Sequence, residues 1–309
     1  MTIIPVQPGE PRRPDGPRDP GDAWVVAESG ERYWGRFGAA GVLAFDPARG
    51  VLLQHRVGWS HFGGTWGIPG GALHEGESAR DGALREAQEE AGIPDGALRA
   101  RFASVLDLRI WSYTTVVADV VSAFEPVISD PESLALEWVP VDEVDQRPLH
   151  PGFGAAWPML RSLLPTHPAI VADAANVVGS VPDGWWKDRA GAAERLRERL
   201  STWTARGVVA PDLGVAADLW YPPVSMVVEG EAREIPDAAD ERVVTVRASG
   251  AGVWKAIAVK RSADLDEARR LRDGGFVVTA VTSDRGLRER LEELGAQVQS
   301  SGWLLERLG

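Results

Sequence analysis

The sequence predicts an α/β protein built from two domains. Its 309 residues exceed the size of a typical single hydrophobic core. In the first half, strand-like runs flank one strongly acidic helix, and in the second half apolar strands alternate with amphipathic helices that end in glycine. We therefore expect a disordered, proline-rich arm over residues 1–20, one α/β domain over residues 21–165 and a second over residues 166–309.

The expected arm has a proline at every third position from Pro5 to Pro20. That spacing suits an extended polyproline segment and cannot build a core, so a solvated tail is favoured over a docking arm.

Composition limits the class of protein. Hydrophobic content of 44% and charged content of 25% are typical of a soluble globular chain. No apolar run approaches the ~20 residues of a membrane span, and the N-terminus lacks the apolar segment of a signal peptide. The absence of cysteine excludes disulfides, thiolate nucleophiles and cysteine-based zinc sites, and it fits a reducing environment. We expect a cytoplasmic protein that does not contact a membrane.

The net charge of −12 is unevenly distributed. Residues 1–165 contain 14 arginines and 23 acidic residues, a charge of −9, which leaves −3 for residues 166–309. An acidic protein does not attract polyanions without local positive charge. If the ligand is a phosphate compound, a divalent metal is the usual source of that charge.

For the first half, the sequence predicts one acidic helix, one closing helix and four strands. The helix runs from Ser78 to Ala91 and ends at Gly92, with Pro94 beyond it. A closing helix over residues 149–165 is expected to break at Pro158. The expected strands cover residues 39–46, 50–57, 113–124 and 134–141.

The acidic helix places Glu86, Glu89 and Glu90 on one face, because residues three and four apart are neighbours on a helix. Like charges at this spacing destabilise a helix by a few tenths of a kcal/mol per pair. A Mg²⁺ or Mn²⁺ ion reverses that effect, since hard cations bind carboxylate oxygens. Taken alone, the three glutamates still favour a solvated helix face.

The residues around these glutamates change that interpretation. Gly71 is followed after five residues by Glu77 and after seven more by "REAQEEAGI". This 23-residue pattern resembles the Nudix box, with small Ala87 where a larger aliphatic residue is common.

The resemblance implies a fold and a reaction. It implies an α/β/α sandwich with a mixed sheet, and metal-dependent hydrolysis of a nucleoside diphosphate linked to a group X, with Mg²⁺ or Mn²⁺ as cofactor. A carboxylate must take the proton from the attacking water, and Glu86 is one candidate. The metal ligands that the resemblance implies are Glu86, Glu89, Glu90 and the Gly70 carbonyl.

The resemblance also assigns supporting residues. Arg85 and Glu77 correspond to the pair that holds loop and helix in register. A further acid from a later loop is expected at the metal, for which Glu132 is our candidate and Glu137 its competitor.

Residues near the box suggest substrate contacts. Arg56 is a candidate phosphate ligand. Trp66 could equally stack on a base or wall the core. Core packing is favoured for Trp111, Tyr113, His55 and His61. The sequence motifs of ADP-ribose and NADH pyrophosphatases are absent, which leaves a nucleoside triphosphate or a modified nucleotide as the substrate.

The second half reads as a parallel sheet covered by helices. Asp173 ends a predicted strand and Asn176 follows it, while Thr282, Ser283 and Asp284 follow another. Carboxyl ends of parallel strands line the ligand crevice of such sheets. Ser283 and Asp284 could instead cap a helix, and Asp173 could be a buried carboxylate bonded to nearby backbone.

These segments resemble PIN-like nucleases of the NYN type, which implies a three-layer domain with a mainly parallel sheet and a second, Mg²⁺-binding site at Asp173, Asn176 and Asp284. The chain departs from that pattern where Val253, Trp254 and Lys255 replace expected acids. A degenerate domain for binding or scaffolding is therefore favoured over a competent nuclease.

Three functions follow, in order of preference. The first is a Nudix pyrophosphohydrolase acting on a small nucleotide. The second is an RNA-processing nuclease that uses the C-terminal domain, and the third is a nucleotide-sensing regulator without hydrolysis. Support for an RNA partner is weak, because glutamates intersperse the basic positions of the helix that would contact it. Those positions are Lys187, Arg189, Arg195 and Arg199.

Overall fold

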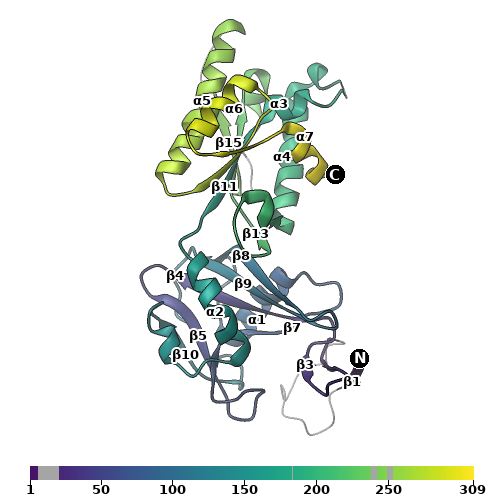
Figure 1. Ribbon diagram of the computed structural model, residues 1–309, viewed down its shortest axis with the longest axis vertical. Coiled ribbons are helices and arrows are strands. Elements are labelled where there is room, and N and C mark those ends of the chain that lie inside the picture. Colours follow the sequence, from purple (N-terminus) through teal and green to yellow (C-terminus); the bar gives the residue numbers. More distant parts are fainter. Residues whose placement is uncertain (6–20, 183, 238–241, 249–252) are drawn as a thin grey trace. The chain divides into compact units, whose positions relative to one another are not determined.

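A computed structural model describes residues 1–5, 21–182, 184–237, 242–248 and 253–309, with the side chains of residues 253–262 excepted. Contacts within the chain define two compact units, residues 1–164 and 165–309, whose elements are labelled in Figure 1. Part of the expected disordered arm is ordered, because Thr2–Pro5 forms strand β1 and pairs with β2. The remainder of the arm, residues 6–20, lies outside the described residues.

The first unit is built on a mixed sheet with the strand order β10-β5-β4-β9-β8. Neighbouring strands are antiparallel except for the parallel pair of β4 and β9. This is the mixed sheet that the sequence resemblance implies. Its strands are β4 (Ala39–Asp46), β5 (Gly50–Arg56), β8 (Leu98–Asp107), β9 (Ser112–Val120) and β10 (Ser133–Val139).

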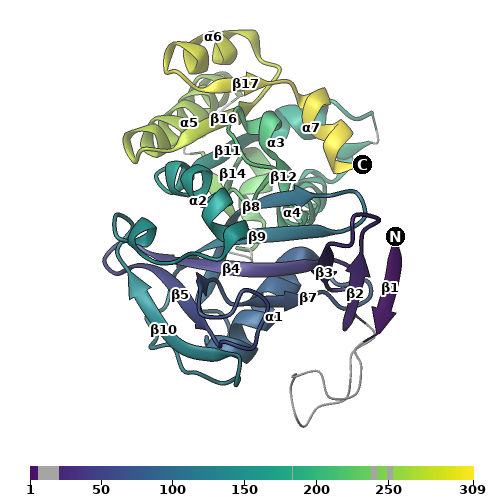
Figure 2. The same ribbon diagram turned by 60° about the horizontal axis from the view of Figure 1, so that its bottom comes forward.

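Three short additions extend this unit. Strand β6 (Trp66–Gly67) pairs with β5, and β7 (Gly70–Ala72) pairs with β4. A separate small sheet joins β1, β2 (Ala23–Val26) and β3 (Arg32–Trp34), as Figure 2 shows.

Helices α1 (Ala79–Ala91) and α2 (Pro151–Leu163) lie on opposite faces of the mixed sheet in both views (Figures 1 and 2). The sheet is apolar between them because β4 and β5 are buried along most of their length, as strands covered on both faces must be. The bounds of α1 confirm the predicted helix, which ends at Gly92 as expected, and Ser78 caps its first turn.

The expected break of α2 at Pro158 is wrong. The helix continues through this proline, whose side chain is exposed to solvent. Pro158 has no backbone N–H to donate to the Gly154 carbonyl, so the helix continues without that one hydrogen bond. Burial of Phe153, Trp157 and Leu160 anchors the helix on both sides of the proline.

The second unit contains a five-stranded parallel sheet in the order β15-β14-β11-β16-β17. The strand order reverses at β11, which is the first of these strands in the chain. The strands are β11 (Pro168–Asp173), β14 (Val224–Val228), β15 (Val243–Arg247), β16 (Val277–Val281) and β17 (Gln297–Gln299).

Helices cover both faces of this sheet. Figures 1 and 2 show α5 and α6 on one face and α3, α4 and α7 on the other. The three-layer, parallel arrangement predicted for the second half is therefore present, while the PIN-like identity stays a prediction. The helices are α3 (Ala174–Gly179), α4 (Arg189–Arg206), α5 (Val253–Asp273), α6 (Arg285–Glu293) and α7 (Ser301–Leu308).

Shorter elements complete the description. A hairpin joins β12 (Val208–Val209) to β13 (Leu219–Trp220). Single 3₁₀ turns occur at Val144–Gln146, Trp185–Lys187, Ala210–Leu213 and Gly230–Glu234. Within the described ranges, every helix is too short or too polar to cross a lipid bilayer.

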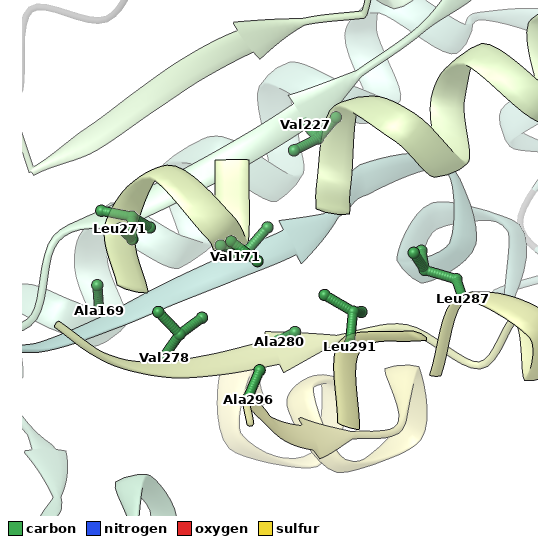
Figure 3. Packing of buried hydrophobic residues seen from close by; sticks show 10 residues of the cluster. Ala169, Val171, Val227, Leu271, Val278, Ala280, Leu287, Leu291 and Ala296 are labelled. Carbon is green, nitrogen blue, oxygen red and sulfur yellow. The ribbon is translucent and has the colours of Figure 1, made fainter. Parts of the chain in front are cut away.

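Side chains from α5, α6 and the sheet form a core in the second unit (Figure 3). Leu287 and Leu291 lie one turn apart on α6 and are each about 1% exposed. They pack against Val171 of β11, Ala280 of β16 and their neighbours. This apolar stripe is what holds α6 on the sheet, since the rest of the helix is charged.

We expect Leu291→Ala to lower the free energy of unfolding by about 2–5 kcal/mol, through lost burial and the cavity left behind. Arg285→Ala changes a side chain of the same helix that is 95% exposed, and should cost less than about 0.5 kcal/mol. Urea denaturation followed by circular dichroism measures both. Equal losses in the two variants would show that α6 is not held by this core.

Candidate active site

The acidic helix α1 is fixed at both ends. The Ser78 hydroxyl accepts a hydrogen bond from the Asp81 backbone N–H at 3.1 Å, which satisfies a free donor of the first turn. Gly92 ends the helix in the left-handed conformation, which costs least for glycine. Between these caps, α1 packs against β4 and β7. The helix therefore presents its glutamates to a defined strand.

Glu90 is 4% exposed, and its carboxylate is held by two donors. Its Oε2 accepts from the Gly70 backbone N–H at 2.9 Å and from the Gln54 amide at 3.2 Å. Burial and the nearby negative charge of Glu86 raise the pKa of Glu90 to about 8, although the Gly70 hydrogen bond acts in the opposite direction. The helix thus buries a carboxylate that lacks a full counter-charge.

Glu86 is buried beside it, directly over Gly71. A Cβ atom added to Gly71 would come within 2.6 Å of the Glu86 carboxylate, so only glycine allows this approach. The two adjacent glycines of β7 thus bring two carboxylates of one helix against the same short strand.

Arg85 partly compensates these charges and ties the preceding loop to the helix. Its Nε and Nη2 donate to the two Glu77 oxygens at 2.9 and 3.0 Å, and Nη2 also donates to the Ala72 carbonyl at 3.0 Å. Nη1 donates to Glu86 at 2.7 Å and to Glu89 at 3.4 Å. Burial disfavours the charged guanidinium, but its hydrogen bonds to Glu77 and Glu86 outweigh burial and raise the pKa of Arg85.

The same contacts act on Glu77. Burial favours its neutral form, yet the Arg85 hydrogen bonds and the His74 backbone N–H lower the pKa of Glu77 overall. Glu77 is therefore a charged residue that bridges the loop and α1. This is the pairing of Arg85 and Glu77 that the sequence predicts.

In the part of the chain that the structure describes, no three acidic or histidine side chains already converge as metal ligands. Arg85 lies between Glu86 and Glu89 and bonds to both. The side chain of Glu89 is 34% exposed, whereas Glu90 is enclosed. The carboxylate oxygens suit a hard cation by their chemistry, and a bound cation would share Glu86 and Glu89 with Arg85 or compete with it for them.

The two later acids are placed differently. Glu132 directly precedes β10, and its backbone carbonyl accepts from the Val57 N–H at 2.9 Å, next to the end of β5. Its negative charge contributes to the raised pKa of Glu90. Glu137 instead pairs with Arg147 at 2.9 Å and is 44% exposed. Of the two candidates, Glu132 is the one near the buried glutamates.

Of the two predicted substrate contacts, Arg56 lies near the buried glutamates, whereas Trp66 is enclosed by other side chains. Arg56 ends β5, and its positive charge acts on Glu90. Trp66 is only 6% exposed. The His55 ring stacks on it at 4.7 Å, and the Arg147 guanidinium lies over it at 4.6 Å. This position favours the core-wall alternative for Trp66 over base stacking.

The predicted second site consists of residues with structural roles. Asp173 is 1% exposed, caps α3 by accepting from the Asn176 backbone N–H at 3.0 Å, and accepts from the Thr282 hydroxyl at 3.0 Å. The Asn176 side-chain oxygen accepts from the Ser283 N–H and the Ser301 hydroxyl. Asp284 caps α6 through the Leu287 N–H. These residues gather at one sheet edge, but their contacts fit the capping and buried-carboxylate alternatives.

The basic positions considered for RNA have local contacts. Arg195 pairs with Asp188 at 3.6 Å, Arg199 donates to the Gly309 carbonyl at 2.8 Å, and Arg189 lies over the Trp185 ring at 5.6 Å. Nothing in these contacts favours an RNA surface. The side chains of Val253, Trp254 and Lys255 lie outside the described residues.

Sequence reasoning missed Gln54, and its expectation of core packing for Tyr113 did not relate this residue to the glutamates. Gln54 is fully buried and donates to both Glu90 and the Ser133 hydroxyl. A single polar residue inside the run "GVLLQHR" was the available signal. The Tyr113 hydroxyl lies against Gly41, which pairs with Gly70. Burial and the charges of Glu90 and Glu86 raise the pKa of Tyr113, although Arg56 opposes them.

Residues 35–163 match the NUDIX domain. The chain is 46% identical over 166 residues to the "Putative 8-oxo-dGTP diphosphatase 3" of Mycobacterium tuberculosis, across 50% of this chain and 76% of that protein. It is 42% identical over 153 residues to the "Nucleoside triphosphate pyrophosphatase/Nudix hydrolase fusion protein" of Bifidobacterium longum, across 47% of this chain and 32% of that protein.

Among solved structures, the crystal structure of RenU, a Nudix hydrolase from M. smegmatis, is 45% identical. The match covers 46% of this chain and 94% of that chain, with a TM-score of 0.43.

Arg85→Lys keeps the charge but cannot bond both Glu77 oxygens at once. We expect it to lower the free energy of unfolding by about 1–2 kcal/mol. The matched control is Arg80→Lys on the same helix, whose partner Asp81 is 55% exposed, and it should cost less than about 0.5 kcal/mol. Chemical denaturation of both variants checks the difference. If Arg85→Lys costs no more than the control, Arg85 does not hold the loop to the helix.

The raised pKa of Glu90 predicts a pH-dependent stability. Between the ordinary value of 4.5 and about 8, the folded chain binds this proton more tightly than the unfolded chain, so stability falls as pH rises. In metal-free buffer we expect a loss on the order of 2 kcal/mol between pH 6 and pH 8. Glu90→Gln should remove this part of the slope, which denaturation in EDTA at both pH values measures. An unchanged slope in the variant would be inconsistent with a buried, proton-binding Glu90.

Proposed function

The chain belongs to the Nudix hydrolase family, and we propose that its first unit hydrolyses a nucleoside diphosphate linked to a group X with the help of a divalent metal. The observation that carries this proposal is the enclosed pair of Glu86 and Glu90 against Gly70 and Gly71. Such a pair is unfavourable in the empty protein and becomes favourable when a cation joins it.

For the substrate we propose a nucleoside triphosphate, including oxidised deoxyguanosine triphosphate. One relative supports this choice by its name, the "Putative 8-oxo-dGTP diphosphatase 3" of Mycobacterium tuberculosis. The absence of the ADP-ribose and NADH motifs in the sequence points the same way.

Mg²⁺ or Mn²⁺ would be held by residues of α1, β7 and the segment before β10. When bound, such an ion neutralises charge on the phosphates and activates a water for attack. The proposed ligands are Glu86, Glu89, Glu90, Glu132 and the Gly70 carbonyl.

The remaining side chains position these groups. Arg85 fixes β7 relative to α1 through the Ala72 carbonyl, and it fixes the following loop through Glu77. Gln54 of β5 orients the Glu90 carboxylate through a hydrogen bond from its side-chain amide. Arg56 supplies positive charge at the end of β5 for a phosphate of the substrate. A helix carboxylate takes the proton from the attacking water, and Glu86 is our candidate.

For the second unit we propose a binding or scaffolding role. Asp173, Asn176 and Asp284 are engaged in caps and in contacts between strand ends. No observation favours nuclease activity over this role.

The test is a panel of nucleotides incubated with the full chain, with Mg²⁺ or with EDTA, and with the products identified. We expect a nucleoside monophosphate and pyrophosphate from a triphosphate, only when Mg²⁺ is present. Glu89→Gln and Glu90→Gln should lower kcat/KM by at least about a hundredfold.

Glu137→Gln provides the control, because it removes an acid that pairs with Arg147 away from the buried glutamates. Its kcat/KM should stay within about twofold of the wild-type value. Hydrolysis that persists in EDTA, or that survives Glu90→Gln, would falsify the proposal.

A further inference from the structure

The loop between β5 and β6 carries two exposed aromatic side chains. Trp59 is 45% exposed and Phe62 is 46% exposed. Isolated exposed aromatics are common on protein surfaces and need no function. Phe62 differs because its backbone conformation and its ring contacts place it in a fixed position beside two histidine rings.

Hydrogen bonds hold this loop in one conformation. The Arg56 and Gly64 backbone N–H groups donate to Thr65 and Arg56 carbonyls, each at 2.9 Å, which closes the base of the loop. The Thr65 hydroxyl donates to the Phe62 carbonyl at 2.6 Å. Phe62 itself has a φ of 55°, a left-handed conformation that bulky residues seldom adopt. The surrounding bonds thus hold an exposed phenyl ring where the chain would not place it by preference.

The Phe62 ring meets two histidines. Its centroid lies 4.3 Å from that of His61 and 4.9 Å from that of His150, with interplanar angles of 64° and 84°. The edge-to-face contact with His150 keeps the two rings nearly perpendicular. His61 is braced in turn by Trp24 of β2 at 5.9 Å.

Arg56 connects this aromatic group to the buried glutamates. Its charge acts on Glu90, and burial together with this charge lowers the pKa values of His61 and His150. Its Nε donates to the His61 carbonyl at 3.3 Å. A ligand whose phosphates meet Arg56 and the carboxylate helix would therefore extend its other end toward Phe62 and His150.

The hydrogen bonds of His150 define what it can recognise. The Gly152 backbone N–H donates to Nδ1 at 3.2 Å, so Nδ1 carries no proton and Nε2 does. Burial, followed by the charges of Arg56 and His61, lowers the pKa of His150 to about 4 and keeps this neutral form at physiological pH. An Nε2–H donor matches a carbonyl oxygen on a base and opposes the amino group of adenine.

We propose that Phe62 and His150 form the nucleobase subsite of this chain, with Phe62 as the stacking surface and His150 as a donor to the carbonyl oxygen of a guanine-type oxopurine. The inference rests on the proposed function, because that function places the phosphates at Arg56 and α1. It deepens that function by assigning the base preference to these two side chains.

Phe62 is tested by binding and by kinetics with the full chain. Calorimetric titration with dGMP should show a dissociation constant roughly tenfold weaker for Phe62→Ala, and Phe62→Trp should restore it, since base stacking on an aromatic ring is worth about this much. The KM for dGTP should rise by a similar factor while kcat changes little. Trp59→Ala is the matched control, because Trp59 is equally exposed on the same loop and its ring does not contact His150 in the described structure. It should bind dGMP as the wild type does.

His150 is tested by base selectivity. In His150→Asn the shorter side chain can still accept from Gly152 but loses the Nε2 donor, so the preference for dGTP over dATP should fall roughly tenfold at unchanged melting temperature. His150→Gln can place an amide N–H near the former Nε2 and should retain most of that preference. Loss of selectivity in both variants, or in neither, would contradict the assigned donor.

The outcomes separate this subsite from the proposed hydrolysis. If the wild type hydrolyses nucleotides but Phe62→Ala and Trp59→Ala bind dGMP equally well, the subsite is wrong and the proposed function stands. If no nucleotide is hydrolysed, the proposed function fails, and dGMP binding still decides the subsite. A change of oligomeric state in Phe62→Ala, with dGMP binding intact, would identify a protein contact surface and overturn the assignment.

Discussion

The close approach of α1 to the Gly70–Gly71 strand is the constraint on which the candidate site depends. The approach is possible because residue 71 is a glycine, since a side chain there would overlap the Glu86 carboxylate. The approach places Glu86 and Glu90 in a space largely closed to water. Two enclosed carboxylates repel each other when both are ionised, so the approach is unfavourable unless a proton or a cation joins them. Arg85 makes it tolerable by bonding to Glu86 while it also fixes Glu77 and the Ala72 carbonyl.

Strand β5 and the segment before β10 supply further side chains around these glutamates. β5 supplies Gln54 to the Glu90 carboxylate and Arg56 at its end, and Glu132 lies beside that end, directly before β10. The loop that follows β5 then carries Phe62 toward His150. β5, the loop after it and the segment before β10 therefore lie between the buried glutamates and the rings of Phe62 and His150. In the proposed function, the phosphates of a nucleotide lie at the glutamates and its base lies at these rings.

Local sequence patterns predicted the parts of the site that depend on nearest neighbours. The end of α1 at Gly92, the face shared by its glutamates and the pairing of Arg85 with Glu77 follow from spacing and from the family resemblance. The choice between Glu132 and Glu137 did not, because a register shift between Ser133 and Ala135 sets where β10 meets β5. Trp66 was ambiguous since its neighbours, His55 and Arg147, are brought to it only by the fold. Asp173 depends on Thr282, which is 109 residues away.

Titration of the full chain with Mn²⁺, followed by the electron paramagnetic resonance of the free ion, tests the central claim most directly. The enclosed glutamates should create a site that Glu90→Gln weakens by at least about tenfold, while Glu137→Gln leaves it unchanged. Equal binding by the wild type and Glu90→Gln would show that the buried carboxylates do not form a cation site.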